Sequence, residues 1–341
     1  MKHAAKAIAI CAAGLSAASS ARAADASLVA AAKAEGRLSW YTTQIIDQLS
    51  KPIGEAFERA YGIKVEYTRS DANEGARRIM TESAAGRMQA DVFDGVASPV
   101  LVKQNLVMAY TPDSARRLPP KYVDKDGHWL ATNLYVYTLG VNTDLVPPGS
   151  EPKTFADLLA PKWKGRMAWS GRASTSSAAG FVGAVLAAMG DDKGRDYLRA
   201  LAKQDIAPVT VSARQLLDQV IAGEYPVAVE ILDNHASISK SKGAPVAWAP
   251  LESNLVALSV MSATREAPHP SAAKLFLDFV MSPEGQALYR DHDYIPVDPA
   301  VTPRDPGLRP DGVHLKGYDP DPAELEELVP KWFGIYREIF G

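Results

Sequence analysis

Strand and helix patterns alternate along residues 28–97, and this alternation constrains the fold more than any other feature of the chain. Helix patterns cover 28–35, 52–61 and 72–87, and each of them closes at or beside a glycine, which is a common helix stop. Strand patterns follow at RLSWYTT (37–43), YGIKVEYT (61–68) and ADVFDGVA (90–97). Because β-α-β units join neighbouring parallel strands, this segment predicts a parallel sheet with helices packed on its faces.

A second α/β unit follows, and two long extended passages flank it. These passages, 129–146 and 244–264, are rich in aromatic and β-branched side chains. The patterns between them predict helices at 178–189, 193–203 and 213–222 and strands at 207–211 and 225–232; beyond them lie a helix pair within 270–297, a loop at 298–324 and a C-terminal helix. Because 341 residues exceed one ordinary core, we predict an α/β protein of two lobes joined by a two-strand hinge.

The first 23 residues have the composition of a secretory signal. Lys2 and Lys6 precede small apolar residues from Ala7 to Ala18, and ARA (21–23) is a cleavage site of small residues. The one cysteine, Cys11, follows Ile10, where a lipidation signal requires a small residue. We therefore predict a periplasmic protein that is cleaved after Ala23, is not lipidated, and has no disulfides.

The charge and motif content of the remaining chain argue against several classes of protein. Residues 1–23 hold three of the 37 Lys and Arg and none of the 40 Asp and Glu, so the chain from residue 24 onward has a formal net charge of −6. A mildly acidic protein is a poor match for nucleic acid or an anionic membrane. The sequence also lacks the G-x-S-x-G, H-E-x-x-H, Walker A and G-x-G-x-x-G motifs, which argues against an enzyme.

Four hydroxyl residues stand at the start of the predicted helix 178–189, in the stretch SGRASTSSAAG (170–180). Helix N-termini carry unpaired N–H groups and partial positive charge, which suit a phosphate or a carboxylate. One serine is enough for an N-cap, so capping alone is the simpler explanation. The extra hydroxyls favour an anion site formed by Ser174, Thr175, Ser176 and Ser177, with Arg172 as a charged clamp or else a surface arginine.

Polar residues also follow other predicted strands, at the edge where open α/β sheets bind ligands. These candidates are Tyr41, Thr42 and Thr43 after the first strand, Ser70 and Asn73 after the second, Ser98 after the third, and Asp233, Asn234 and His235 after the strand 225–232. Three of these sets have a structural alternative: Tyr41 as a wall residue, residues 70–73 as an Asx-type turn, and residues 233–235 as a helix cap.

Six motifs in one order resemble the bacterial extracellular solute-binding proteins of ABC transporters. They are EGRLSWYTT, ADVFDG, TFADLLAPKWKGRMAW, AGEYPVAV, KGAPVAWAPLES and PSAAKLFLDFVMSPEGQ, and they span nearly the whole chain after the signal. The resemblance is to the branch that binds ferric ion, phosphonates, sugar phosphates, thiamine and polyamines. It implies the periplasmic-binding-protein type II fold, with 24–133 plus about 252–297 as lobe 1 and 134–251 plus about 298–341 as lobe 2. It also implies a small-molecule ligand in the interlobe cleft, delivered to an ABC permease in the inner membrane.

The resemblance leaves the cargo open. Ferric-ion binders of this branch place adjacent tyrosines after the strand that corresponds to 225–232, where this chain has Asp233, Asn234 and His235. We therefore expect a small organic anion of the phosphonate, phosphate-ester or carboxylate type, bound by a monomer without cofactor or metal. The alternatives are ferric iron held by non-tyrosine ligands and, second, a periplasmic enzyme or sensor on this fold. Glu230 and Glu252 would place negative charge near the site and favour a cationic or zwitterionic group.

Overall fold

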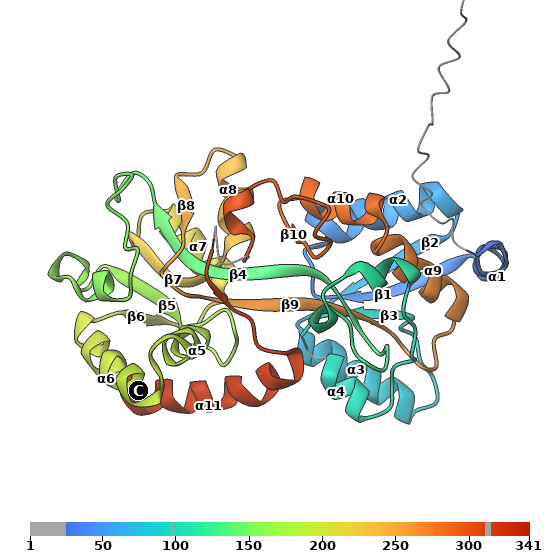
Figure 1. Cartoon of the computed structure of the whole chain (residues 1–341), viewed down its shortest axis with the longest axis horizontal. Coiled ribbons are helices and arrows are strands. Elements are labelled where there is room, and N and C mark those ends of the chain that lie inside the picture. Colours follow the sequence, from blue (N-terminus) through green and yellow to red (C-terminus); the bar gives the residue numbers. More distant parts are fainter. Residues whose placement is uncertain (1–24, 97, 311–314) are drawn as a thin grey trace, which may run out of the picture.

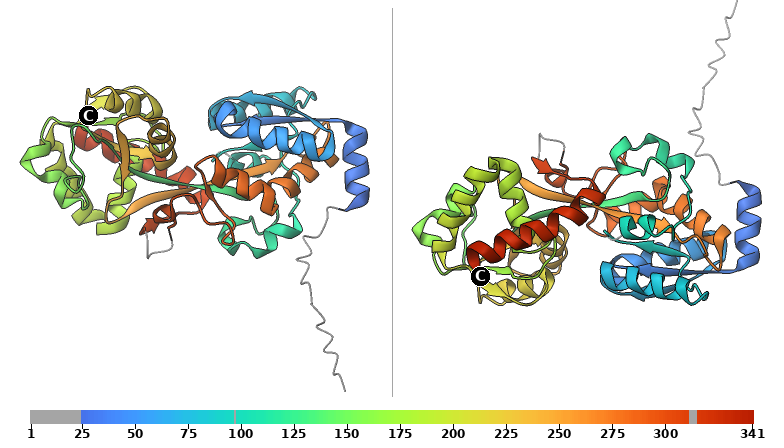
Figure 2. Two further views of the ribbon diagram at one scale, coloured as in Figure 1. Left: turned by 90° about the horizontal axis from the view of Figure 1, so that it is seen from above. Right: turned by 90° about the horizontal axis from the view of Figure 1, so that it is seen from below.

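The computed structural model describes residues 25–96, 98–310 and 315–341, so the predicted signal with Cys11 lies outside the described residues. Figure 1 shows two α/β lobes side by side, connected by β4 (Leu130–Asn142) and β9 (Asn254–Ala263). Figure 2 shows the same division from two further directions. Within the described ranges, no helix combines the length and the apolar character that crossing a bilayer requires.

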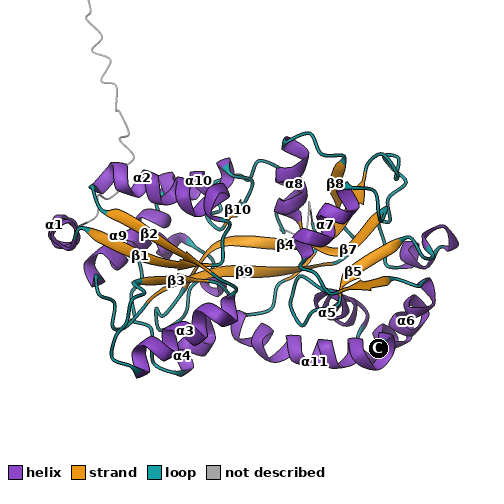
Figure 3. Cartoon of the chain, turned by 180° about the vertical axis from the view of Figure 1, so that it is seen from behind, coloured by secondary structure: helices purple, strands orange, loops and turns teal. Residues whose placement is uncertain are grey.

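Lobe 1 contains a sheet whose first three strands are parallel, in the spatial order β2 (Lys64–Arg69), β1 (Arg37–Thr42) and β3 (Val92–Asp94). Its helices are α1 (Ala26–Glu35), α2 (Lys51–Tyr61), α3 (Ala72–Ala84), α4 (Ser98–Lys103), α9 (Pro270–Val280) and α10 (Pro283–Asp291). Figure 3 shows α2, α9 and α10 on one face of this sheet and α3 and α4 on the other. Gly36 and Gly62 end α1 and α2 in the left-handed conformation that glycine adopts without steric cost. The predicted β-α-β-α-β order is therefore confirmed.

Two strands belong to both lobes. From Leu130 to Val136, β4 pairs antiparallel with β9; from Tyr137 onward it pairs with β7 (Val227–Leu232), and from Leu139 also with β8 (Val246–Ala249). The core changes at the same point, because Val136 is buried among the side chains of lobe 1 and Tyr137 among those of lobe 2. The extended passages predicted to join the lobes therefore form the centre of the sheet.

Lobe 2 continues the sheet with β7, β5 (Met167–Ser170) and β6 (Ala207–Val209), which are parallel to one another. Its helices are α5 (Ala178–Met189), α6 (Asp191–Leu201), α7 (Ala213–Ile221) and α8 (Asp233–Ser241). α5 contains no charged residue, and most of its side chains are buried under α11 (Pro322–Phe340). Figure 1 shows α11 beneath lobe 2, with its first turns reaching the edge of lobe 1, where an ion pair between Lys103 and Glu326 joins it to α4 at 3.4 Å.

Several short elements complete the chain. The two-residue strand β10 (Ile295–Pro296) pairs with β4, and β11 (Gly317–Tyr318) pairs with β9. One-turn helical segments lie at Ile46–Ser50, Asp113–Arg117, Pro120–Tyr122, Ala156–Leu159, Pro161–Trp163, Ala202–Gln204 and Pro306–Leu308. β11 lies in the segment 298–324, which the sequence pattern predicted as loop throughout.

Candidate functional site

The carboxyl ends of the lobe 1 strands are organised around Asp94, a fully buried residue at the end of β3. Its carboxylate accepts four hydrogen bonds: from Trp40 Nε1 at 2.7 Å, from Thr42 Oγ1 at 2.6 Å, and from the Thr43 backbone N–H and Oγ1 at 2.8 Å each. Thr42 is buried and Thr43 is half-buried, so the two predicted site residues have different amounts of free surface. The local role of both threonines is to hold the carboxylate that fixes the strand ends.

Tyr41 also faces its own lobe. Its side chain is 2 % exposed, its hydroxyl donates to Glu82 Oε1 at 2.7 Å, and the guanidinium of Arg78 lies 4.6 Å from its ring centre. Burial and the Glu82 carboxylate raise the pKa of Tyr41 above its ordinary value. The structure therefore places Tyr41 against α3, in agreement with the alternative that it is a wall residue.

The other predicted residues of lobe 1 lie around the same strand ends. Ser98 is fully buried and donates to the Gly95 carbonyl at 3.3 Å. Gly95 is pressed against Thr43, since a Cβ at residue 95 would lie 2.8 Å from Thr43 Cγ2. Ser70 is half-buried at the start of α3, whereas Asn73 is exposed on that helix. Thr43, Ser70 and Ser98 are thus brought together at one edge of the sheet.

The four hydroxyls before α5 have three different environments. Ser177 is the N-cap: its hydroxyl donates to the Ser174 carbonyl at 2.6 Å and accepts from the Ala179 N–H at 3.1 Å. Thr175 Oγ1 is hydrogen-bonded to the Tyr137 hydroxyl at 2.9 Å. The side chains of Ser174 and Ser176 are half-buried and form no hydrogen bond to a described residue. One serine therefore caps the helix, and the remaining hydroxyls are not needed for capping.

Arg172 lies in the turn before these serines and is exposed. Its carbonyl accepts from the Ser174 N–H at 3.1 Å, and its guanidinium forms no ion pair within the described part of the chain. This environment agrees with the alternative of a surface arginine.

Asp233, Asn234 and His235 form the first turn of α8. The explanation of this segment as a helix cap is wrong, because the N-cap is Leu232 and no side chain caps the helix. Instead, Asp233 Oδ1 accepts from the backbone N–H of Val136 in β4 at 3.0 Å, while Oδ2 is buried without a partner among the described residues. The three residues therefore lie against the strand that connects the lobes.

The structure adds five residues that the sequence did not single out: Gln44, Arg69, Tyr135, Tyr137 and Tyr294. The Tyr135 hydroxyl donates to Gln44 Oε1 at 2.6 Å, and Arg69 Nε donates to the Gln44 carbonyl at 3.0 Å. The Tyr135 and Tyr294 rings meet edge to face at 6.3 Å. Tyr135 and Tyr137 are two residues apart on one strand, a spacing that places both on one face, and this was the available sequence signal.

Charges from the two lobes meet at these residues. Arg69 of lobe 1 acts electrostatically on His235 of lobe 2 and on Tyr294. We define the interlobe cluster as Arg69, Tyr135, Tyr137, Thr175, Ser176, Glu230, Asp233, Asn234, His235 and Tyr294. These residues come from β2, β4, β7, α8, the turn before α5 and the residue before β10, and so from both lobes.

Burial changes the protonation of the cluster. It raises the pKa of Asp233 to about 7 and raises the pKa of Glu230 well above its ordinary value. It lowers the pKa of His235 to about 3, with Arg214 and Arg69 acting in the same direction. His235 is therefore neutral at neutral pH, Asp233 is about half ionised, and burial favours the protonated form of Glu230. Arg69 carries the permanent positive charge of the cluster.

Replacing Asp233 by asparagine is expected to change the pH dependence of stability. Native Asp233 holds its proton more tightly than the unfolded chain does, so the native state loses stability as pH rises from about 4 to about 7. Asparagine stays neutral, so the stability of Asp233→Asn relative to the wild type should grow by about 2.5 kcal/mol between pH 5 and pH 8. Urea unfolding of both proteins at each pH measures this difference, and a difference that is independent of pH contradicts it.

His235 gives the control for this prediction, because its shift has the opposite sign. Its lowered pKa makes the native state gain stability as pH rises from about 3 to about 6.5. His235→Gln should therefore lose stability relative to the wild type as pH rises through that range, and change little above it.

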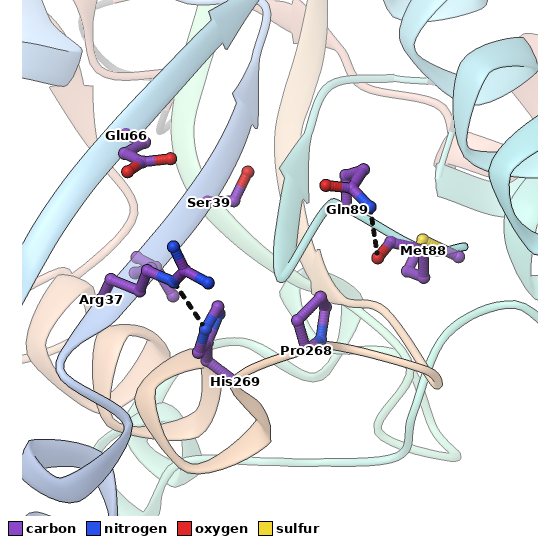
Figure 4. A pocket seen from close by; sticks show the side chains of 8 residues that line it. Arg37, Ser39, Glu66, Met88, Gln89, Pro268 and His269 are labelled. Carbon is purple, nitrogen blue, oxygen red and sulfur yellow. Dashed lines mark hydrogen bonds between the residues drawn. The ribbon is translucent and has the colours of Figure 1, made fainter.

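A pocket of 250 Å³ lies at the opposite end of the lobe 1 strands. Figure 4 shows Arg37 and His269 next to each other among its lining residues, joined by a hydrogen bond of 3.0 Å from Arg37 Nε to His269 Nε2. His269 is also bonded to the buried carboxylate of Asp91, from Nδ1 to Oδ2 at 2.9 Å. The pocket lies at the amino ends of β1 and β2, away from the interlobe cluster, and its Arg37 and His269 side chains bind each other.

A second pocket, of 390 Å³, borders the interlobe cluster at Tyr294. It lies between α8 and the segment 293–308, and is lined by Ser237, Lys240, Ser241, Trp248, Asp293, Tyr294, Ile295, Pro303, Arg304, Asp305 and Leu308. An ion pair between Arg304 and Asp293 at 3.3 Å lies at its edge. The pocket thus lies between the C-terminal half of α8 and the segment around β10.

Among the described residues, one group of three carboxylate or imidazole side chains brings its ligand atoms within 4.8 Å of one another: Asp124, Asp126 and His128. Asp124 Oδ2 accepts from the backbone N–H groups of Asp126 and His128 and is bonded to His128 Nδ1. These bonds close a local turn, and the group lies apart from the interlobe cluster.

The chain is similar to known binding proteins. The family model described as bacterial extracellular solute-binding protein matches residues 53–310. The Fe(3+)-binding periplasmic protein of Serratia marcescens is 24% identical over 279 residues, which are 77% of this chain and 79% of that protein. An uncharacterized protein of Haemophilus influenzae is 28% identical over 276 residues, which are 75% of this chain and 76% of that protein.

Two solved structures share the fold. Iron-bound HitA from Pseudomonas aeruginosa is 23% identical, with a TM-score of 0.71 over 89% of this chain and 99% of that chain. The periplasmic binding protein AfuA from Actinobacillus pleuropneumoniae, with fructose-6-phosphate bound, is 22% identical, with a TM-score of 0.72 over the same shares. The expected periplasmic-binding-protein type II fold is thereby confirmed.

Proposed function

The chain belongs to the bacterial extracellular solute-binding proteins, and we propose that within this family it captures a small organic anion between its two lobes. It is a periplasmic solute-binding protein of the kind that serves ABC importers, and it delivers this anion to a permease in the inner membrane. It acts as a monomer, is not lipidated, and binds its ligand without transforming it. The ligand carries a phosphonate, phosphate-ester or carboxylate group.

One observation carries this proposal: the interlobe cluster combines hydrogen-bond donors with a single permanent charge, which is positive. The α5 N-terminus offers N–H groups, Thr175 and Ser176 offer hydroxyls, and Arg69 supplies the cation. Burial raises the pKa values of the acids Glu230 and Asp233 and so disfavours negative charge in the cluster. An anion that contacts Arg69 on lobe 1 and the α5 turn on lobe 2 would favour the conformation in which the lobes are closed on it.

The experiment is a thermal-unfolding screen of residues 24–341, freed of ligand by denaturation and refolding. The compounds are fructose 6-phosphate, phosphonates, dicarboxylates, ferric citrate, thiamine and polyamines. A ligand at about one hundred times its Kd should add about 2.7 kcal/mol of stability, or several degrees of Tm. We expect this shift with a phosphate, phosphonate or carboxylate; a screen in which only cationic compounds shift Tm contradicts the proposal.

Variants locate the site of the bound compound. Ser176→Ala and Arg69→Gln should each raise its Kd about tenfold or more. Ser176→Ala should change stability little, whereas Arg69→Gln loses the bond to the Gln44 carbonyl and should lower stability by about 1 kcal/mol. Ser282→Ala is the matched control, because Ser282 caps α10 in lobe 1 by accepting from the Gly285 N–H at 3.0 Å. It should lower stability by about 1 kcal/mol and leave the Kd unchanged.

Ferric iron is the second candidate, and the tyrosines of the cluster favour it. Tyr137 and Tyr294 lie close to Asp233, and Tyr135 packs against Tyr294. Phenolate and carboxylate oxygens suit a hard trivalent cation. Burial raises the pKa of each tyrosine and opposes phenolate formation, so iron would have to displace these protons. A visible phenolate-to-iron absorption band that Tyr294→Phe weakens would support iron; its absence with bound ferric citrate would count against it.

A further inference from the structure

Glu230 occupies a strained position in β7. The pairing of β4 with β7 shifts register between Thr138 and Gly140, so that Val229 and Glu230 together oppose the single residue Leu139. The φ of Glu230 is 68°, in the left-handed region that favours glycine. Bulges of this kind redirect a side chain, and strain held by a non-glycine residue is common at functional sites.

The bulge directs the carboxyl group against the first turn of α5. The side chain is 4 % exposed, and its Oε1 is buried without a hydrogen-bond partner among the described residues. A Cβ on Gly180 would lie 2.8 Å from Glu230 Oε1 and 1.8 Å from the Thr175 carbonyl oxygen. Any side chain larger than that of glycine at position 180 would block this close approach. The unpaired Glu230 Oε1 therefore lies at the N-terminus of α5.

The titratable groups on the described elements packed around Glu230 place no positive charge against its carboxyl group. On β4 the facing group is the Tyr137 phenol, while α5 and β5 carry no titratable side chain. On α7, Arg214 pairs with Asp218 and donates to the His235 carbonyl and Ser239 Oγ of α8. On α8 the nearest groups are Asp233 and the neutral His235.

Burial of this unpaired carboxyl group favours its protonated form. Desolvation is the cause of the raised pKa of its carboxyl group, and no neighbouring cation opposes this shift. A protonated carboxyl group carries one O–H donor, whereas an ionised carboxylate can only accept.

We propose that Glu230 is a proton-bearing ligand contact, whose uncharged carboxyl group donates a hydrogen bond to an oxygen of the anion held at the α5 N-terminus. This inference rests on the proposed function and adds a named contact to it, between Glu230 and a terminal oxygen of the phosphate, phosphonate or carboxylate group. It also makes binding dependent on pH. Once Glu230 ionises, its charge repels the anion, so binding at high pH must take up one proton and the affinity falls.

The test compares the wild type with Glu230→Gln, which keeps the size and a donor but does not titrate. Calorimetric titrations with inorganic phosphate and with fructose 6-phosphate give Kd values between pH 6 and pH 9. The titration of the probe itself affects both proteins equally. The ratio of the two Kd values at each pH therefore reports only the effect of Glu230 ionisation on binding. We expect the wild-type Kd to rise about tenfold or more relative to that of Glu230→Gln as pH increases.

Two results overturn the inference while leaving the proposed function intact: identical pH profiles of the two proteins, or a Kd that Glu230→Gln weakens about tenfold at every pH. A failure of both proteins to bind any anion contradicts the proposed function, and this inference with it. Infrared spectra of ligand-free Asp233→Asn, which lacks the other buried carboxyl group of the cluster, provide a test that does not depend on Glu230→Gln folding. A protonated-carboxyl carbonyl band should be present at pH 7 and shift when phosphate is added; a band that phosphate leaves unchanged contradicts the contact.

Discussion

Asp94→Ala is expected to lower the free energy of unfolding by about 4 kcal/mol. The carboxylate is fully buried and accepts four hydrogen bonds, from Trp40, Thr42 and Thr43, at 2.6–2.8 Å. Alanine removes the acceptor and leaves the buried Trp40 N–H without a partner, at a cost of about 1–3 kcal/mol for each unsatisfied donor. Urea unfolding of the ligand-free proteins measures the loss.

Two further variants test the reason for this loss. Asp94→Asn keeps the shape and one acceptor oxygen, so it should lose about half as much stability as Asp94→Ala. Asp126→Ala, at an exposed position, should stay within about 0.5 kcal/mol of the wild type. If Asp94→Ala is as stable as Asp126→Ala, the carboxylate does not organise the strand ends.

Gly180→Ala is expected to destabilise the protein by about 3 kcal/mol and to impair ligand binding. The added methyl group would lie 1.8 Å from the Thr175 carbonyl oxygen and 2.8 Å from Glu230 Oε1, both far inside van der Waals contact. The turn before α5 must move to accommodate it, and that turn carries Thr175 and Ser176. Calorimetric unfolding and the ligand screen together measure both effects.

The matched control is Gly334→Ala in α11. A Cβ at residue 334 meets no atom within 4 Å, and the residue lies in a regular helix. Alanine has a higher helix propensity than glycine, so Gly334→Ala should stabilise the protein by about 0.5–1 kcal/mol. Opposite signs for the two Gly→Ala changes are the expected result; equal losses would mean that the clash at residue 180 has no special effect.

The elements of this fold were largely predictable because their sequence signals are local. Helix 178–189 was predicted with the bounds that α5 has, since an apolar run lies between a capping serine and Gly190. β10 and β11 were not predictable, because each is two residues long and exists through pairing with a distant strand. The same holds for the β4–β7 bulge, which depends on register between segments about ninety residues apart.

The candidate site was predictable only where its sequence signal is local. The sequence singled out the hydroxyls before α5 but gave no means to choose Ser177 as the cap, because backbone conformation makes that choice. Arg69 and Tyr294 escaped notice, since their positions relative to His235 arise from the packing of three distant segments. Which of the predicted residues bind ligand is still a prediction, and the variants above test Ser176 directly.

Native mass spectrometry of the protein purified from the periplasm, combined with metal analysis of the same sample, tests the central claim most directly. Our account predicts a fraction of the molecules with an added mass that matches one phosphate-, phosphonate- or carboxylate-bearing compound, lost after denaturation and refolding, and no stoichiometric iron. Stoichiometric iron without such a compound would contradict it, and would assign the interlobe cluster to a metal.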